Sequence, residues 1–286
     1  MISDIITILI VGAMISAIYA LIAIGFTMIF GVGGILNLTH GALLMIAAYA
    51  YFVTQPYIGR AGGVIVGIVL AAVASYGVYM GLVRYIEENV VITFMATIMA
   101  ALALQEAMTM AFSQQAQVLT PIMPGSVAIA GTRMQYDQLL AFVFSWVMIG
   151  MLWYYVTNTK DGRAILATSM SERGAIFTGV DLPRVRRQTW LIAGAFAGVG
   201  GIFIGRLQQT SPEMWLEPLT LAFMIVIIGG VGSIKGSIIA AYLIGYIETL
   251  TVALLGAPYR VVVALLIIIA VIMYRPEGLY GREYLE

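Results

Sequence analysis

Residues 30–41, FGVGGILNLTHG, hold the polar side chains that are best placed for chemistry in this chain. They include His40, the only histidine, and Asn37, inside a stretch (residues 5–59) without a formal charge. The glycines favour an interrupted helix, because glycine adopts backbone angles that other residues avoid. Free backbone groups at membrane depth are tolerated only beside a cavity or other protein. We therefore expect a break that lines a substrate path. Tight packing with ordinary turns at the membrane surface is the alternative for this segment, and a structural role is an equal alternative for His40.

A second glycine cluster, GGVGSIKGS at residues 229–237, suggests a second break. Ser233 supplies a hydroxyl there, as Thr39 does beside the first break. The segment lacks the adjacent Gly-Lys-Ser/Thr of a phosphate-binding Walker A loop, and no such triplet occurs elsewhere in the chain. It also lacks the G-x-S-G of an intramembrane serine protease. The chain is therefore expected not to be an enzyme and not to hydrolyse ATP.

Two acids lie inside apolar segments, Glu106 beside Gln105, and Glu248. Ionisable groups within a membrane are costly and suggest function. An interhelical hydrogen bond, or a place near the membrane boundary, is an equal alternative. The sequence has no cysteine and one histidine, so no metal site and no cofactor in this chain are expected.

The elements that position these residues must lie in lipid. The chain of 286 residues is 62% hydrophobic and only 10% charged, whereas soluble domains carry about 25% charged residues. A net charge of zero gives no reason to expect nucleic acid as a partner. Apolar runs that suit membrane helices occupy residues 5–30, 41–54, 62–83, 90–112, 138–157, 188–206, 218–229, 236–256 and 259–274. We expect one all-α polytopic membrane domain (residues 1–286), with about 8–10 helices, some short or interrupted.

The basic residues predict the orientation. Six of the 14 fall in residues 158–187, which places this loop in the cytoplasm. Counting crossings outward puts the N-terminus outside and the C-terminus inside. The cytoplasmic side then also holds Arg84, Lys235, Arg275 and Arg282, and the outer side holds Arg60, Arg133, Arg206 and Arg260.

Residues 158–187 are too long for a tight turn. Leu166, Met170 and Phe177 share one stripe at helical spacing, and Gly179 stops the pattern. The pattern predicts a short amphipathic helix that docks on a partner. A helix lying on the lipid surface is the alternative.

A faint internal repeat accompanies the glycine clusters. HGALLMIAAY (residues 40–49) is similar to KGSIIAAY (residues 235–242), with a gap of two residues. Paired interrupted helices often meet at the substrate path of transporters. Chance similarity between two apolar segments rich in small residues is the alternative.

At these motifs the sequence resembles the membrane permease subunits of branched-chain amino acid ABC transporters. Four blocks carry the resemblance, in the family's order and over nearly the whole chain. They are GFTMIFGVGGILNLTHGALLMIAAY (25–49), GRAILATSMSERGAIFTGVDLPRVRRQTWLIAGAFAGVGGIFIG (162–205), IGGVGSIKGSIIAAYLIGYIE (228–248) and YRPEGLYG (274–281). Lys235 departs from the pattern, because the family usually has proline there.

The resemblance implies an importer of small amino acids or amides in the cell membrane of a prokaryote. It implies two partner subunits that bind ATP-Mg, a second permease (a paralogue or a second copy), and an extracytoplasmic binding protein. The implied path residues are Asn37, Thr39, His40, Gly41, Gly230, Gly232 and Ser233. The implied positions for coupling to the ATPases are Arg163, Ala175 and Gly179, within residues 163–180.

Leucine-type amino acids lead among the expected substrates, with urea and short amides behind. Two other classes of protein stay open from the residues. An ion-coupled secondary transporter would use Glu106 and Glu248 as proton or ion sites. A passive channel for a small amide would need neither these acids nor an ATPase.

Overall fold

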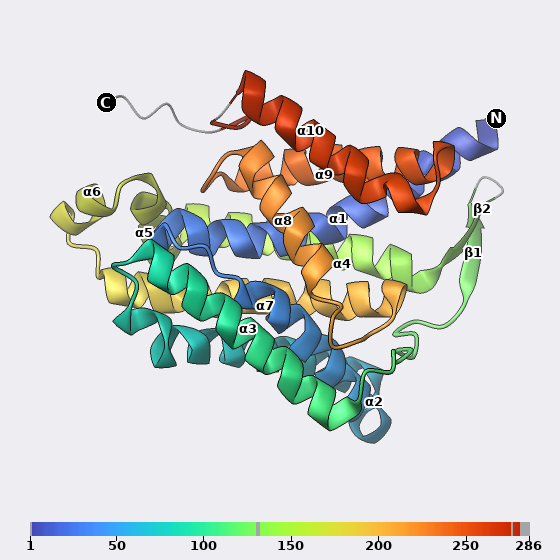
Figure 1. Cartoon of the computed structure of the whole chain (residues 1–286), viewed down its shortest axis with the longest axis horizontal. Coiled ribbons are helices and arrows are strands. Elements are labelled where there is room, and N and C mark those ends of the chain that lie inside the picture. Colours follow the sequence, from blue (N-terminus) through green and yellow to red (C-terminus); the bar gives the residue numbers. More distant parts are fainter. Residues whose placement is uncertain (1, 130–131, 276, 281–286) are drawn as a thin grey trace.

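The structure is a computed structural model that describes residues 2–129, 132–275 and 277–280. Seven helices in these residues are long and apolar enough to cross a membrane by length and composition. They form one bundle (Figure 1). The helices are α1 (Ile2–Gly33), α2 (Thr39–Gly81), α3 (Val90–Phe112), α4 (Tyr136–Asn158), α5 (Lys160–Met170), α6 (Glu172–Phe177), α7 (Leu182–Gln208), α8 (Leu216–Gly229), α9 (Ile234–Leu254) and α10 (Arg260–Tyr274). Two short 3-10 helices, η1 (Val83–Tyr85) and η2 (Ala257–Tyr259), and a hairpin of antiparallel strands β1 (Ser126–Ile129) and β2 (Thr132–Gln135) complete it.

Helix α2 contains two of the predicted crossings. Its backbone leaves the helical conformation at Gly59, where φ is +77°. The chain then folds back on itself, because a Cβ on Gly67 would lie 2.8 Å from the carbonyl oxygen of Ala47. The apolar helix α8, with 14 residues, is shorter than the seven candidates and matches the predicted short segment. The all-α class and the presence of short and interrupted helices are therefore confirmed.

The first predicted break is present between α1 and α2. Residues 34–38 are not helical, and Gly34 has φ of +63°. His40 Nε2 lies 3.1 Å from the carbonyl oxygen of Ile22, and a Cβ on Gly25 would meet the His40 ring. Gly25 precedes the end of α1 by eight residues, about 12 Å of helix. The chain therefore runs back along α1, and α2 begins inside the bundle.

A similar return precedes α8. Helices α7 and α2 run alongside each other, since Gly201 lies against Leu44 and Gly205 against Ala48. Trp215, the residue before α8, packs against Gly41 near the beginning of α2. The segment after α7 therefore leads the chain back into the bundle before α8 starts. The N-terminal ends of α2 and α8 meet there.

The second predicted break, residues 230–233, joins α8 to α9. Gly230 and Gly232 have φ of +97° and +76°. A Cβ on Gly31 would lie 2.8 Å from the Cα atom of Gly232, so the two glycine clusters touch. This close approach is possible because neither residue carries a side chain.

The connecting segments gather at two opposite ends of the bundle (Figure 1). The β hairpin and the N-terminal end of α1 lie at one end, and α5 and α6 at the other. The prediction of one amphipathic helix within residues 158–187 is wrong in one respect. Ser171 interrupts it, since its hydroxyl accepts the Gly174 N–H and starts α6 as a new helix. Arg282, used in the orientation count, lies outside the described residues.

Candidate functional site

The first break is held by a compact set of hydrogen bonds. Asn37 Oδ1 accepts the backbone N–H of Thr39 at 3.1 Å and also the Thr39 hydroxyl. This turn satisfies one of the free N–H groups at the start of α2. Asn37, Thr39 and His40 are all buried in protein. The break is therefore a packed element, closed to solvent in this conformation.

Two polar atoms at the break have no hydrogen-bond partner among the described residues, Asn37 Nδ2 and His40 Nδ1. Asn37 Oδ1 accepts a backbone N–H, so the unpaired amide atom is a donor. His40 Nε2 faces a carbonyl oxygen and must donate, which leaves Nδ1 as an acceptor in the neutral ring. A buried unpaired polar group costs about 1–3 kcal/mol and calls for an explanation.

Gly41 and Gln105 both contact Trp215. A Cβ on Gly41 would lie 2.8 Å from the Trp215 ring, so glycine is required for this packing. The Trp215 indole N–H donates to Gln105 Oε1 at 2.6 Å. Glu106 lies on an exposed part of α3. Gln105 and Glu106 are adjacent candidates in the sequence. In the structure, only the Gln105 side chain points into the bundle.

The second break borders a large cavity of about 930 Å³ at the same end of the bundle as α5. Gly232 and Ser233 line it, whereas Gly230 is not among the lining residues. The Ser233 hydroxyl accepts the Gly236 N–H and caps α9. Lys235 also lines the cavity, and its ammonium group lies 5.0 Å from the Trp153 ring centroid. The walls combine apolar side chains with a few hydroxyl and charged groups.

Glu248 is buried and takes part in a polar network between helices. Its Oε1 atom lies 3.5 Å from an Arg260 guanidinium nitrogen, and its Oε2 atom has no hydrogen-bond partner among the described residues. Arg260 also pairs with Glu217 at the start of α8. These ion pairs join α8, α9 and α10. Glu248 therefore has an interhelical partner, as the structural alternative in the sequence analysis expects.

The expected coupling positions have different environments. Gly179 has φ of +81° and follows α6 in a Schellman motif, with Val180 N–H donating to Ala175 O and Gly179 N–H to Ile176 O. Ala175 is buried, and Arg163 is exposed on α5. Phe177, at the end of α6, is 89% exposed. The predicted stop at Gly179 is therefore present.

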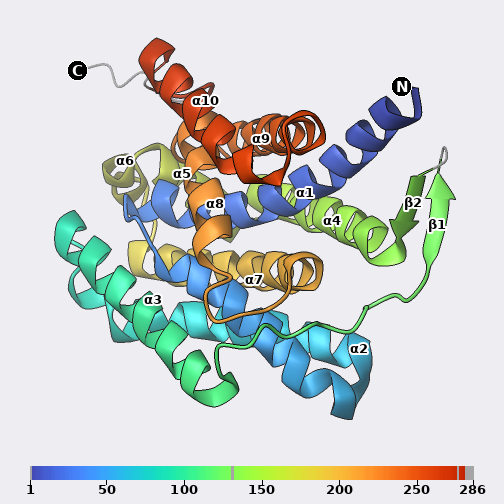
Figure 2. The same ribbon diagram turned by 45° about the vertical axis from the view of Figure 1, so that its right-hand side comes forward.

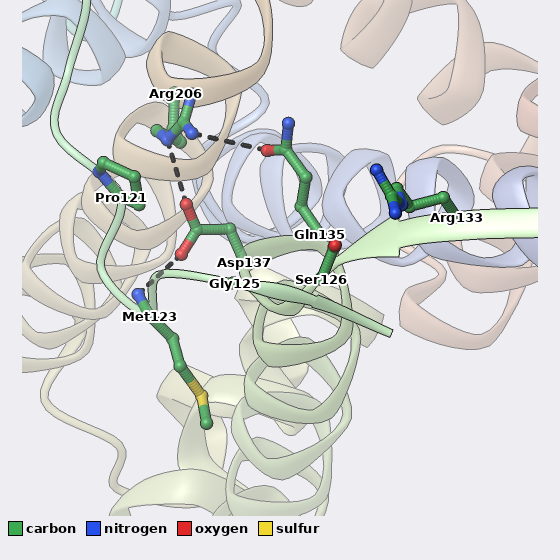
Figure 3. A pocket seen from close by; sticks show the side chains of 8 residues that line it. All are labelled: Pro121, Met123, Gly125, Ser126, Arg133, Gln135, Asp137 and Arg206. Carbon is green, nitrogen blue, oxygen red and sulfur yellow. Dashed lines mark hydrogen bonds and ion pairs between the residues drawn. The ribbon is translucent and has the colours of Figure 1, made fainter. Parts of the chain in front are cut away.

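A polar pocket of about 380 Å³ lies beside the β hairpin (Figure 3). Arg206 Nε pairs with Asp137 Oδ2 at 2.9 Å, and Asp137 Oδ1 accepts the Met123 N–H at 2.7 Å. Figure 3 shows Arg206 and Gln135 turned toward each other, and their hydrogen bond is 3.3 Å long. These contacts fasten the long α3–β1 connection to α4 and α7.

Sequence reasoning did not select several residues of these sites. Trp153, Asp137 and Trp215 belong to them only because distant segments meet. Among the described residues, no group of three or more His, Cys, Asp or Glu side chains could hold a metal ion.

The chain is similar to known transport proteins over nearly its whole length. The high-affinity branched-chain amino acid transport system permease protein BraD of Pseudomonas aeruginosa is 27% identical, covering 96% of this chain and 95% of that protein. The probable branched-chain amino acid transport permease protein LivH of Methanocaldococcus jannaschii is 24% identical over 96% of this chain and 92% of its own length. The ribose import permease protein RbsC of Haemophilus influenzae is 22% identical, with 90% and 81% covered.

A solved structure, PsaBC from Streptococcus pneumoniae in complex with Fab, shares the fold. It has a TM-score of 0.53 at 12% identity, and 98% of each chain is covered. The sequence profile of the family described as branched-chain amino acid transport system / permease component matches residues 8–272. This chain therefore belongs to that family of multi-pass membrane permeases.

Proposed function

We propose that this chain is the permease subunit of an ATP-driven importer for branched-chain or related small amino acids. Its partners are two ATP-binding subunits, a second permease and an extracytoplasmic substrate-binding protein. The β hairpin faces outside and α5 and α6 face the cytoplasm. The N-terminus is then outside and the C-terminus inside.

The observation that carries the proposal is the pair of unpaired atoms at the first break. A zwitterionic amino acid has a carboxylate that accepts hydrogen bonds and an ammonium group that donates them. Asn37 Nδ2 is a donor and His40 Nδ1 an acceptor. The N-terminal ends of α2 and α8 add positive dipole ends beside them, which favours a carboxylate. Opening of the break during transport would let both atoms pair with substrate.

The second break would serve the cytoplasmic end of the path. Gly232 and Ser233 border the large cavity next to α5, and Gly232 touches Gly31. Closure of the ATPases would move α5 and α6 and alter this contact. No step of ATP hydrolysis involves this chain, which has no Walker A sequence.

Reconstitution in proteoliposomes tests the proposal. The chain would be co-expressed with ATPase, second-permease and binding-protein subunits from the same organism, and uptake of labelled leucine measured with and without ATP. ATP-dependent uptake, together with co-purification of an ATPase after gentle solubilisation, is the expected result. Uptake that follows an ion gradient without ATP would favour a secondary transporter. Uptake of urea or a short amide in place of leucine would change the substrate class.

A further inference from the structure

Arg186 joins the α5–α6 region to the start of α3. It is the fifth residue of α7, and its two terminal nitrogens bind two carboxylates. One nitrogen donates to Glu87 Oε1 at 2.6 Å, and the other donates to Glu172 at the start of α6. The side chains of Arg186 and Glu87 are only 18% and 15% exposed. A planar guanidinium holds two such partners in fixed directions.

Glu87 sits in the turn that begins α3. Next to it, Asn89 Oδ1 accepts the Ile92 N–H and caps the helix. The Thr93 hydroxyl donates to Ile86 O at 2.8 Å, which ties the first turn of α3 to the preceding turn. A shift of Glu87 must therefore carry the beginning of α3 with it.

Helix α3 lies at the edge of the bundle (Figure 2). Its buried residues are Thr93, Thr97 and Ala101, and most of its large apolar side chains are exposed. A membrane helix that buries few side chains in protein can shift at small cost, because lipid replaces its apolar contacts.

On the face of α3 that points into the bundle, Thr97 and Gln105 form hydrogen bonds with the segments that precede α2 and α8. These two segments are called the inner helix starts. The Thr97 hydroxyl lies 3.3 Å from Leu36 O and 3.4 Å from the Leu38 backbone nitrogen, in the non-helical segment before α2. Gln105 accepts the Trp215 indole N–H immediately before α8. Thr97 and Gln105 are eight residues apart, about 12 Å along one helix.

We propose that α3 is the mechanical link between the α5–α6 region and both inner helix starts, with Arg186 and Glu87 as the positioning residues that attach it. The inference rests on the proposed function, in which ATPase partners move α6. Motion of α6 pulls Glu172, Arg186 and Glu87 together, and α3 transmits it as a rigid rod. The Thr97 and Gln105 contacts then shift the segments before α2 and α8 at the same time, so both helix starts open together.

The charges around Glu87 indicate that its attachment to the α5–α6 region depends on the ion pair with Arg186. Burial raises the pKa of the Glu87 carboxyl, and the neighbouring Glu172 adds to this effect. The guanidinium groups of Arg186 and Arg84 lower the pKa and favour the charged form. Removal of Arg186 would leave the partly buried Glu87 carboxylate without its main cation, whereas removal of Glu87 would leave Arg186 paired with Glu172 alone.

The first test measures substrate uptake per ATP hydrolysed in the reconstituted complex. Glu87→Gln should lower this ratio at least fivefold while complex assembly and basal ATP hydrolysis stay unchanged. Glu88→Gln is the matched control, since Glu88 is exposed and has no ion pair among the described residues. Glu87→Asp, which keeps the charge, should recover part of the ratio. A purely structural role would lower assembly and uptake in proportion, and would overturn the inference.

The second test follows α3 directly. The chain has no cysteine, so spin labels can be placed at Val91→Cys on α3 and Val69→Cys on α2 without background from this subunit, in a complex whose partner subunits have had any cysteines replaced. The distance between the labels should change when the complex is trapped with ATP and vanadate, and should stay constant in Glu87→Gln. An unchanged distance in the parent, or a normal uptake ratio in Glu87→Gln, overturns the role of α3 alone. A parent complex without ATP-dependent uptake overturns the proposed function as well.

Discussion

Replacement of Gly179 tests whether the end of α6 is needed for coupling to an ATPase. Gly179 has φ of +81°, and a Cβ placed there would meet nothing within 4 Å. The cost of a side chain therefore comes from the backbone alone. A left-handed conformation costs an ordinary L-residue roughly 1–2 kcal/mol, most for a β-branched residue and least for asparagine.

These costs are large for so short a helix. Helix α6 has six residues and relies on the Schellman hydrogen bonds from Gly179 and Val180. A loss of about 1–2 kcal/mol changes the population of the capped state by a factor of roughly 5–30. We expect Gly179→Asn to behave much like the parent, Gly179→Ala to be intermediate and Gly179→Val to be the most impaired.

The assay compares ATPase co-purification and leucine uptake per ATP hydrolysed across the three variants. Insertion should be equal in all of them, because each membrane helix satisfies its own backbone hydrogen bonds. If Gly179→Val couples uptake to ATP like the parent, the end of α6 does not transmit the motion. If asparagine and valine impair coupling equally, the left-handed backbone is not the cause.

Three further predictions concern other parts of the molecule. Asn37→Ser keeps an oxygen for the Thr39 turn but removes the unpaired Nδ2 donor, so we expect lower leucine uptake at normal complex stability; normal uptake would exclude a substrate contact. Gly31→Ala should destabilise the purified complex by about 1–3 kcal/mol in thermal unfolding, because the Cβ would lie 2.8 Å from a Cα of the second break. The control Gly77→Ala, with nothing within 4 Å, should be neutral or stabilising by up to about 1 kcal/mol, and equal losses would refute the packing argument. Since burial raises the pKa of Glu87, acidification of the solution at the α6 end of the bundle should protonate Glu87 at a higher pH than an ordinary glutamate and weaken coupling. A carboxyl whose pKa is raised by folding favours the folded state when it is protonated. As the pH falls, coupling should therefore be lost before the stability of the complex is lost. Loss of coupling and of stability at the same pH in a titration would contradict the prediction.

Much of the architecture follows from the sequence by itself. A lipid environment forces helices, so apolar runs and their charged boundaries locate the crossings. Glycine clusters predicted breaks at residues 31–41 and 229–236, and both are present, because left-handed backbone and close helix contact need residues without a Cβ. Gly179 was predicted to stop a helix for the same reason. These are local properties of the chain, and local sequence is enough to determine them.

Only the tertiary structure decided which distant residues meet. No pattern in the sequence showed that Gly41 packs on Trp215 or that Gln105, rather than its neighbour Glu106, faces the bundle. The rotation of a helix about its axis depends on packing against its neighbours, and an apolar membrane helix has no polar face to reveal it. In the sequence Arg186 is likewise one basic residue among six in a loop, whereas the fold places it between Glu87 and Glu172. Its partners lie 99 and 14 residues away in the chain, and contacts at such separations are fixed by the path of the whole backbone.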